Sequence, residues 1–365
     1  MIADRTMGER CQQTSGLEGT RVSPAAASDE VQRSRIKAID VAARARVSVA
    51  TVSLVANDKA AGRVSEGTIR RVQQAIDDLG YIVNQAARSL ATGRRQCVAL
   101  VAQDMTNPFI SAIAAGVAEA LGGQTQLLLV ASGSGSQEPD MRHVFGTDVD
   151  GVLLDYPVTV PAEALEAQRP IVVMDDPKVP DGASRVCFDL QAGAGQLADH
   201  LITLGHRTIA YLDSPRPAAT FADRRRYLTD QLRRQHKDVR ILRVHSDIEI
   251  AAARSKVLAS WPAWAEAGVT AVVAASDIQA YGALGALAQL GVDVPGRVSV
   301  ASFDDLPFAE IVWPPLTAIN LPAFDLGFEA ATLLKDIIER GNQARRTVVL
   351  PSRLAIRGST GPAVS

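Results

Sequence analysis

The stretch from Ile39 to Asn57 reads IDVAARARVSVATVSLVAN and divides into two amphipathic pieces around Arg46, Val47 and Ser48. Small apolar residues recur in each piece at the spacing that places them on one face of a helix. They are Val41, Ala42 and Ala45 in the first piece, and Val52, Val55 and Ala56 in the second. Two short helices that meet through small side chains across a tight turn predict a helix-turn-helix.

The opposite face of the second helix carries four side chains, one turn apart in pairs: Val49 with Ser53, and Ala50 with Leu54. We expect this face to be exposed and to read base edges in the major groove of DNA. The same pattern also fits an ordinary helical hairpin in a protein core, so the stretch alone leaves both interpretations open.

A third helix is predicted after Ser65, which can cap its first turn, and Gly80 is expected to end it. Its apolar stripe consists of Ile69, Val72, Ile76 and Leu79. The segment 84–91, NQAARSLA, can form a further helix, but it has too little apolar surface to fold alone.

Residues 36–93 resemble the DNA-binding headpiece and hinge of the LacI/GalR family of bacterial repressors. The resemblance is carried by DVA at 40–42, VS at 47–48, TVS at 51–53, Asn57, VS at 64–65, LGY at 79–81, Asn84 and Leu90. It implies an all-α helix-turn-helix domain over residues 34–83 and a hinge helix with a linker over residues 84–96.

The resemblance also implies which residues contact DNA. Val49 and Ala50 would meet base edges, while Leu54 replaces an arginine that many family members use to bind guanine. Thr51 and Ser53 are expected to bind phosphate oxygens, and Asn57 is expected either to do the same or to bond locally to the backbone.

In the hinge, the residues implied to lie at the minor groove are Asn84, Ala87, Arg88 and Leu90. Leu90 would be an apolar wedge between bases, as the family leucine is. The alternative is a flexible linker whose Leu90 packs on the rest of the chain.

Charge is distributed unevenly along the chain. From Ser34 to Arg95 there are 11 Lys or Arg and 5 Asp or Glu, although the whole chain has a formal net charge of −2. A basic front region on an acidic remainder is typical of a protein that binds nucleic acid at one end.

Residues 1–33 show no periodicity and are expected to be a disordered leader. No secretory signal or apolar span is evident, and three scattered cysteines favour a reducing cytoplasm.

From Cys97 onward, short apolar strands alternate with helical stretches, which predicts parallel sheets covered by helices on both faces. The candidate strands are Val98–Val101, Leu127–Val130, Gly151–Leu154, Ile171–Met174, Val186–Phe188, Thr208–Leu212, Ala271–Ala275 and Val298–Phe303. They are too many for one small domain. We therefore expect residues 97–365 to form two doubly wound subdomains, with chain crossings near residues 190, 320 and 345.

This region resembles the effector domain of the same family, which has the type I periplasmic-binding-protein fold. The matching stretches are NPF at 107–109, VDGVLL at 149–154, LITLGHRTIAYL at 201–212, SDIQAYGAL at 276–284, FDD at 303–305, PPLT at 314–317 and LAIRGST at 354–360. The resemblance implies a ligand cleft between the subdomains and dimerisation through this region.

Polar side chains at strand ends are the candidate effector ligands, because ligands in such folds bind beyond the carboxyl ends of the strands. The candidates are Phe109, Asp175, Arg224, Asp277 and Asp304. Arg224 and Asp304 match family positions that touch effector, although a surface ion pair is the alternative. Asp277 equally fits a helix cap, Phe109 equally fits a core aromatic, and Asp176 is expected to be a solvent or capping neighbour.

These observations predict a sequence-specific transcriptional repressor whose operator affinity is controlled by a small molecule, with carbohydrate favoured and purine as the alternative. It would act as a homodimer or tetramer on double-stranded DNA, without a membrane. The rival functions are a solute-binding protein of transport and a cytosolic α/β enzyme acting on a sugar or nucleotide. We expect no catalytic residues, cofactor or metal, because no catalytic or phosphate-binding motif and no metal spacing is present.

Overall fold

The computed structural model describes residues 36–57, 59–81, 95–102, 104–131, 141–155, 169–176, 183–216, 218–341 and 345–364. The expected leader and the hinge residues Asn84, Ala87, Arg88 and Leu90 lie outside these ranges. The chain divides into two compact units, residues 1–85 and 86–365, which we call the headpiece and the body. Within the described ranges, no helix is both long and apolar enough to span a membrane.

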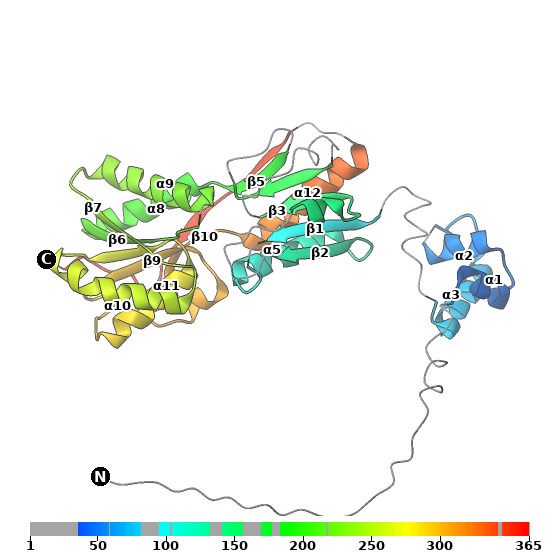
Figure 1. Ribbon diagram of the computed structural model, residues 1–365, viewed down its shortest axis with the longest axis horizontal. Helices are drawn as coiled ribbons and strands as arrows, with labels where there is room; N and C mark the ends of the chain where they lie inside the picture. The colour runs from blue at the N-terminus through cyan, green and yellow to red at the C-terminus, as the bar shows by residue number, and fades with distance from the viewer. Residues whose placement is uncertain are drawn as a thin grey trace, which may run out of the picture. The chain divides into compact units, whose positions relative to one another are not determined.

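The headpiece consists of α1 (Ala38–Ala45), α2 (Val49–Ala56) and α3 (Glu66–Leu79), drawn in blue in Figure 1. The hydroxyl groups of Ser48 and Ser65 accept hydrogen bonds from backbone N–H groups in the first turns of α2 and α3. Gly80 ends α3 in the left-handed conformation, as expected. The three helices enclose one small core made of Val41, Ala42, Ala45, Val52, Val55, Ala60, Val72 and Ala75.

Arg46 ends α1 with φ 55°, a left-handed conformation that glycine adopts without a steric penalty. Lys37 precedes α1 and offers no side-chain cap to its first turn. The Asp40 carboxylate compensates in part, because it accepts a hydrogen bond from the backbone N of Lys37 at 2.7 Å. The helix-turn-helix therefore forms without its most favourable turn residues.

The body contains two six-stranded sheets, which we call sheet A and sheet B. Sheet A has the order β11-β5-β4-β3-β1-β2, and sheet B has the order β12-β10-β9-β8-β6-β7. All strand pairs are parallel except β10 with β12. This confirms the prediction of two doubly wound α/β subdomains, which lie side by side in Figure 1.

The strands of sheet A are β1 (Cys97–Ala102), β2 (Gln126–Ala131), β3 (Gly151–Leu154), β4 (Ile171–Met174), β5 (Ser184–Phe188) and β11 (Thr347–Leu350). Those of sheet B are β6 (Thr208–Asp213), β7 (Arg240–His245), β8 (Ala271–Ala274), β9 (Ser299–Asp304), β10 (Thr317–Asn320) and β12 (Arg353–Ala355). The chain passes between the sheets after β5, after β10 and after β11. The third passage comes later than the predicted position near residue 345, because β11 continues in sheet A as far as Leu350.

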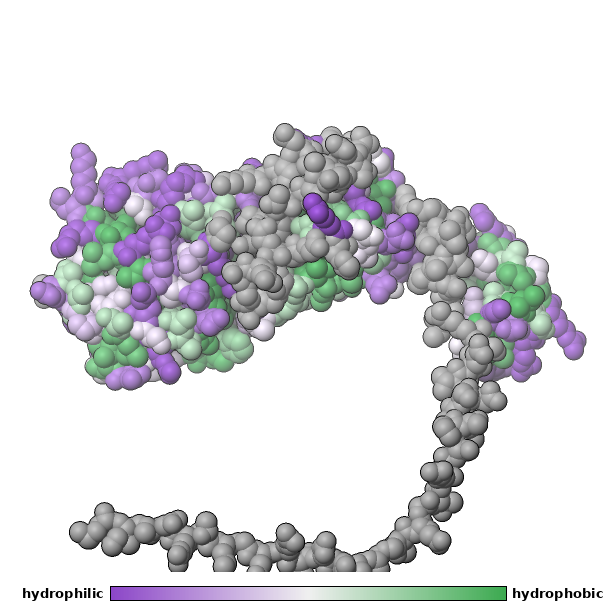
Figure 2. Space-filling model, in the orientation of Figure 1, coloured by the Kyte–Doolittle hydropathy of each residue, from purple (hydrophilic) through white to green (hydrophobic). Residues whose placement is uncertain are grey.

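The helices of the body are α5 (Pro108–Leu121), α6 (Met141–Gly146), α8 (Leu190–Thr203), α9 (Ala219–Gln235), α10 (Ile250–Glu266), α11 (Asp277–Gln289), the short 3-10 helix η1 (Pro307–Glu310) and α12 (Ala323–Arg340). The outer helices are amphipathic. In α9, for example, Leu228 and Leu232 are buried while Arg233 and Arg234 are exposed, and Figure 2 shows the hydrophilic surface in the region of this helix. The helices thus shield the apolar strands from water.

Helices α5 and α12 approach each other unusually closely, although more than two hundred residues separate them in the chain. A Cβ atom added at Gly116 would lie 2.0 Å from the backbone oxygen of Phe324, and one at Gly327 would lie 2.1 Å from that of Ile113. Only glycine fits at these two positions. This contact holds α12 against sheet A after the chain has left sheet B, and it supports the helix whose first turn borders the cavity described below.

Candidate functional site

The outward face of α2 carries Val49, Ala50 and Ser53, which are all exposed, as predicted for a surface that contacts base edges. Leu54 differs from the prediction, because it is only half-exposed and packs against the headpiece core. Burial of its apolar side chain against Val52, Val55 and their neighbours is favourable, whereas an arginine here would have to reach into solvent. Leu54 therefore contributes to the headpiece core as well as to the edge of this face.

The polar residues of α2 make local hydrogen bonds. The Ser48 hydroxyl accepts a hydrogen bond from the backbone N of Thr51 at 3.1 Å and lies 2.9 Å from the Thr51 hydroxyl. The Asn57 amide donates to the backbone oxygen of Ser53 at 2.7 Å, which is the local alternative considered for this residue. Its Oδ1 atom is buried and has no hydrogen-bond partner among the described residues. DNA contacts by Thr51, Ser53 and Asn57 remain predictions.

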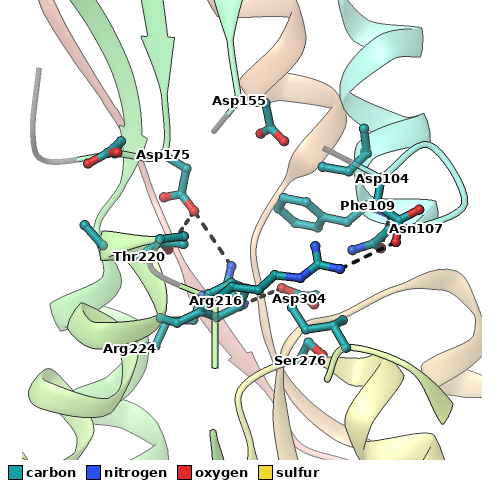
Figure 3. Close-up of a pocket in the computed structure, with 16 residues that line it drawn as sticks. Asp104, Asn107, Phe109, Asp155, Asp175, Arg216, Thr220, Arg224, Ser276 and Asp304 are labelled. Carbon is teal, nitrogen blue, oxygen red and sulfur yellow. Dashed lines mark hydrogen bonds and ion pairs between the residues drawn. The ribbon is translucent and has the colours of Figure 1, made fainter. Parts of the chain in front are cut away.

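In the body, a cavity lies between the two sheets at the carboxyl ends of their strands (Figure 3). Sheet A and its helix α5 contribute Asp104, Asn107, Phe109, Ile110, Asp155, Asp175 and Asp176. Sheet B and its connections contribute Arg216, Ala218, Ala219, Thr220, Phe221, Arg224, Ile248, Ser276 and Asp304. The wall is therefore built by both subdomains, as expected for a ligand site in this architecture.

Arg224, in the second turn of α9, lies at the centre of the cavity wall and is 3% exposed. Its Nη1 atom donates to Asp304 Oδ1 at 2.6 Å and to the backbone oxygen of Ala275 at 2.8 Å. Its Nη2 atom lies 3.7 Å from Asp175 Oδ2, across the division between the sheets. The guanidinium also lies over the rings of Phe221 and Phe303, at 5.2 and 5.6 Å from their centroids.

Asp175 and Asp304 occupy strained backbone positions directly after β4 and at the end of β9. Their φ angles are 48° and 113°, in a region that side chains other than glycine rarely adopt. Burial raises the pKa of Asp175 to about 6, although Arg224 and a hydrogen bond from Thr220 oppose the rise. Burial also raises the pKa of Asp304, against the same guanidinium. Each carboxyl group is thus held in a conformation that aims it into a poorly hydrated space.

Two further contacts join the subdomains at the cavity, in addition to that of Arg224 with Asp175. The Thr220 hydroxyl of α9 donates to Asp175 Oδ2 at 2.7 Å, and Arg216 Nη2 lies 3.7 Å from Asp104 Oδ2. Figure 3 shows the Arg216 side chain extending across the cavity toward Asp104. A ligand that enters here meets polar groups from both subdomains. Its binding therefore changes which relative orientation of the two subdomains is favoured.

Phe109 borders the cavity from the first turn of α5 and is 7% exposed. Its ring also packs edge-on against Phe188, with centroids 6.2 Å apart. Both interpretations of this residue, as a core aromatic and as a wall of the ligand site, are therefore compatible with its position.

Asp277 does not line the cavity, in contrast to the prediction. It is the first residue of α11 and is fully buried. Its carboxylate accepts hydrogen bonds from the backbone N of Leu306 at 2.6 Å and from the Ser302 hydroxyl. These contacts turn the side chain toward the loop after β9, and the neighbouring Ser276 borders the cavity instead.

Several lining residues were not among the sequence candidates: Asp104, Asn107, Asp155, Arg216, Thr220, Phe221 and Ser276. Asp155 directly follows the buried strand β3, just as Asp175 directly follows β4. Its place after a strand could therefore have identified it as a candidate ligand in the same way. Asp176 is a correction, because it is 3% exposed and lines the cavity rather than facing solvent. Arg216 lies in a connection without periodicity, and no sequence signal marked it.

Among the described residues, no group of three or more His, Cys, Asp or Glu side chains is arranged to hold a metal ion. His206 has a structural role at a helix–strand corner, where its ring nitrogens lie 2.9 Å from the Thr270 hydroxyl and 3.1 Å from the backbone oxygen of Gly361. Burial lowers the pKa of this imidazole to about 4, so it is neutral near pH 7. The side chains that line the cavity therefore offer hydrogen-bond donors and acceptors to a polar ligand.

Two family models match the chain. The model for bacterial regulatory proteins of the lacI family matches residues 38–84, and the model for the periplasmic binding protein-like domain matches residues 198–360. The ribose operon repressor of Bacillus subtilis is 31% identical over 319 residues, which cover 86% of this chain and 94% of that repressor.

The chain belongs to the LacI family of bacterial regulatory proteins. It is accordingly a DNA-binding transcriptional regulator and not an enzyme. The transcriptional regulator CelR of Thermobifida fusca is 34% identical over 337 residues, which cover 87% of this chain and 96% of CelR. Membership of this family also excludes the transport function considered from the sequence, because the headpiece is part of the shared region.

Solved structures of LacI-family members share the fold. A complex of CelR with cellobiose has a TM-score of 0.65 at 31% identity and covers 89% of this chain and all 100% of CelR. A LacI-family regulator from Enterococcus faecium with bound ribose has a TM-score of 0.66 at 25% identity and covers 73% of this chain and 100% of its own. The Lac repressor dimer bound to operator matches with a TM-score of 0.75 at 23% identity, over 89% of this chain and 99% of that one, which supports the fold.

Proposed function

We propose that this LacI-family regulator is a repressor that releases its operator when a carbohydrate binds in the body cavity. The observation that carries the proposal is the set of polar groups that meet there from both subdomains: Arg224 and Asp304 from one side, and Asp175 from the other. Charged donors and acceptors that converge with fixed geometry suit the many hydroxyl groups of a sugar. The ribose operon repressor and the cellobiose complex of CelR support the same ligand class.

A carbohydrate fits the cavity better than a purine. Five carboxyl groups line it, namely Asp104, Asp155, Asp175, Asp176 and Asp304. Carboxylates accept hydrogen bonds from hydroxyl groups, whereas a purine offers few donors and mostly ring acceptors. The Phe109 ring gives an apolar surface on which the C–H face of a sugar ring can rest.

Operator recognition is assigned to α2 and the hinge. Val49, Ala50 and Leu54 would contact base edges, and thymine methyl groups are the groups that apolar side chains can recognise there. Thr51, Ser53, Asn57 and Arg88 would bind phosphates, whereas Asn84, Ala87 and Leu90 would lie at the minor groove, with Leu90 as the wedge.

The active form is a homodimer, since two headpieces are needed to bind a pseudo-palindromic operator. A large apolar surface is available for self-association in and after η1, where Phe308, Ile311 and Trp313 are 51%, 77% and 89% exposed. Replacing Trp313 by Glu should shift the protein from dimer toward monomer in sedimentation experiments. An unchanged mass at micromolar concentration would show that this surface is not the interface, and a parental mass of four chains would replace the dimer with a tetramer.

The central test measures binding of the purified full chain to DNA from upstream of its own gene, with fluorescence anisotropy as the readout. We expect specific binding that one member of a panel of mono- and disaccharides weakens, and that adenine, guanine and hypoxanthine leave unchanged. Arg224→Lys should retain DNA binding and lose the response to that sugar, because a lysine cannot reproduce the contacts with Asp304 and the Ala275 oxygen.

Two outcomes would contradict the proposal. Release by a purine and by no sugar would replace the carbohydrate with a purine as effector. A response that is equally strong in Arg224→Lys would remove this cavity as the effector site.

In the same assay, Leu90→Ala should weaken specific binding by roughly tenfold and non-specific binding much less, because the wedge acts only at a deformable base step.

A further inference from the structure

The described wall of the cavity has an excess of negative charge. Its ionisable side chains are five carboxyl groups, from Asp104, Asp155, Asp175, Asp176 and Asp304, and two guanidinium groups, from Arg216 and Arg224. Carboxyl groups therefore outnumber guanidinium groups by three among the described lining residues. Burying unmatched carboxylates is costly, and the cost falls when a bound cation compensates them.

Both guanidinium groups are already engaged with carboxylates. Arg224 binds Asp304 at 2.6 Å and lies 3.7 Å from Asp175, and Arg216 lies 3.7 Å from Asp104. A phosphate or carboxylate on a ligand would have to displace one of these partners while facing the remaining carboxyl groups. The wall therefore disfavours phosphorylated sugars and uronic acids.

Asp155 directly follows β3 and lines the cavity together with Asp175. Within the described parts of the chain, no group donates a hydrogen bond to its side chain, and it faces Asp175, from the end of the neighbouring strand β4. Burial and the charge of Asp175 raise the pKa of Asp155 well above its usual value. In Figure 3 both side chains extend into the cavity from the same side. Two carboxyl groups in this arrangement can bind one ammonium group between them.

A second unsatisfied group indicates that the ligand also carries oxygen. The Nη1 atom of Arg224 binds Asp304 and the Ala275 oxygen, whereas its Nη2 atom lies 3.7 Å from Asp175 Oδ2, which is too far for a hydrogen bond. The N–H group at Nη2 needs an acceptor such as a ring or hydroxyl oxygen. Together with the carboxylates, it requires a ligand that offers an ammonium group and oxygen atoms on one small frame.

We propose that the effector is an amino sugar whose ammonium group binds between Asp155 and Asp175, with a sugar oxygen accepting from Arg224. This inference rests on the proposed function and narrows its ligand class from carbohydrates in general to cationic ones. The ammonium group replaces the protons or counterions that the cavity otherwise holds, and Phe109 covers the apolar face of the ring.

The test compares matched pairs of sugars by calorimetric titration of the full chain at pH 7.5. D-glucosamine is compared with D-glucose, and D-galactosamine with D-galactose, while D-glucose 6-phosphate serves as the anionic probe. We expect at least one amine to bind about tenfold or more tightly than its neutral parent, because the ammonium group adds charged hydrogen bonds that a hydroxyl group lacks. The phosphate should not bind.

Asp155→Asn should reduce the ratio of amine to neutral affinity by about tenfold, since it removes one of the two charges that hold the ammonium group. Asp199→Asn is the matched control, because Asp199 is an exposed carboxylate of α8 that bonds to Gln235 outside the cavity. It should retain the parental ratio. A ratio that Asp155→Asn leaves unchanged would show that Asp155 does not bind the ammonium group.

The results separate this inference from the function on which it rests. If a neutral sugar binds as tightly as its amine, or more tightly, the cationic ligand class is wrong and the carbohydrate-controlled repressor stands. If no sugar of either kind binds, and none changes DNA binding, both proposals fail. A neutral sugar that releases DNA while its amine does not would also overturn the cationic class alone.

Discussion

At the scale of single residues, the contrast between Asp277 and Asp304 is instructive. Both are buried acidic residues at the ends of sheet B elements, and both were expected in the ligand site. Asp304 reaches the cavity through a backbone with φ 113°, whereas Asp277 starts a helix and turns back toward Leu306 and Ser302. A strained backbone and contact with a buried arginine distinguish Asp304, which lines the cavity, from Asp277, which has a structural role.

The role of Asp277 can be tested by its two truncations. Asp277→Ala leaves the Leu306 N–H and the Ser302 hydroxyl unpaired in the interior, and should lower the free energy of unfolding of the body by about 2–4 kcal/mol. Asp277→Asn keeps one acceptor oxygen and should lose much less. Urea denaturation of both variants measures this difference. Equal losses, or a lost sugar response in Asp277→Asn, would argue for a direct part in the site.

The pH dependence of effector binding should follow from Asp175. Burial raises its pKa to about 6, and Asp304 and Asp176 add to the rise while Arg224 and Thr220 oppose it. The carboxyl group is therefore ionised above about pH 6 and becomes protonated as the pH falls through that value. Binding of an amino sugar should therefore weaken as the pH falls below about 6, by up to roughly tenfold per unit.

Calorimetry in buffers with different ionisation enthalpies checks this expectation, because binding below pH 6 should release protons. Asp175→Asn should bind weakly at every pH and show a smaller step, while Asp199→Asn should retain the parental profile. Affinity that rises as the pH falls from 7 to 5 would contradict the role of Asp175.

At the scale of elements, the contact between α5 and α12 positions one wall of the cavity. The last turns of α5 lie under α12 at Gly116, and its first turn carries Phe109. Helix α12 follows a strand of sheet B but packs on sheet A. The orientation of α5 therefore depends on a segment that comes late in the chain.

Replacing Gly116 by Ala should destabilise the body by at least about 1–3 kcal/mol, because the new methyl group would lie 2.0 Å from the Phe324 backbone oxygen. Gly195→Ala is the matched control in α8, where the nearest atom is the Gln231 amide nitrogen at 3.9 Å. Without that clash, alanine should stabilise the helix by about 0.5–1 kcal/mol. Thermal unfolding followed by circular dichroism compares the two. A neutral Gly116→Ala would show that the helices can separate at little cost.

At the scale of the whole molecule, the chain consists of two units with separate cores, and only the body contains the cavity. In the absence of DNA, we expect two unfolding transitions in calorimetry. A sugar effector at one hundred times its Kd should stabilise the body by about 2.7 kcal/mol and leave the headpiece transition in place. An equal shift of both transitions would mean that the two units unfold together.

The local features of this protein could be predicted from its residues. The helices of the headpiece, their caps at Ser48 and Ser65, and the central strands of both sheets depend on periodicity and on neighbours within a few positions. The strands β7, β10, β11 and β12 were not predicted. Three of them lie at sheet edges, where half-exposed residues lack a continuous apolar run, and β10 is a strand of four residues next to an edge.

The composition of the cavity is a property of the tertiary structure. Arg224, Asp175 and Asp304 could be proposed from strand ends and from a family resemblance, but Asp104 and Arg216 meet only because two sheets face each other. The same holds for the partial burial of Leu54 and for the turn of Asp277 away from the ligand site. Periodicity and capping act between near neighbours in the chain. The contacts that shape the cavity join residues that are tens of positions to more than a hundred positions apart, so only the packing of the folded chain decides which of them meet.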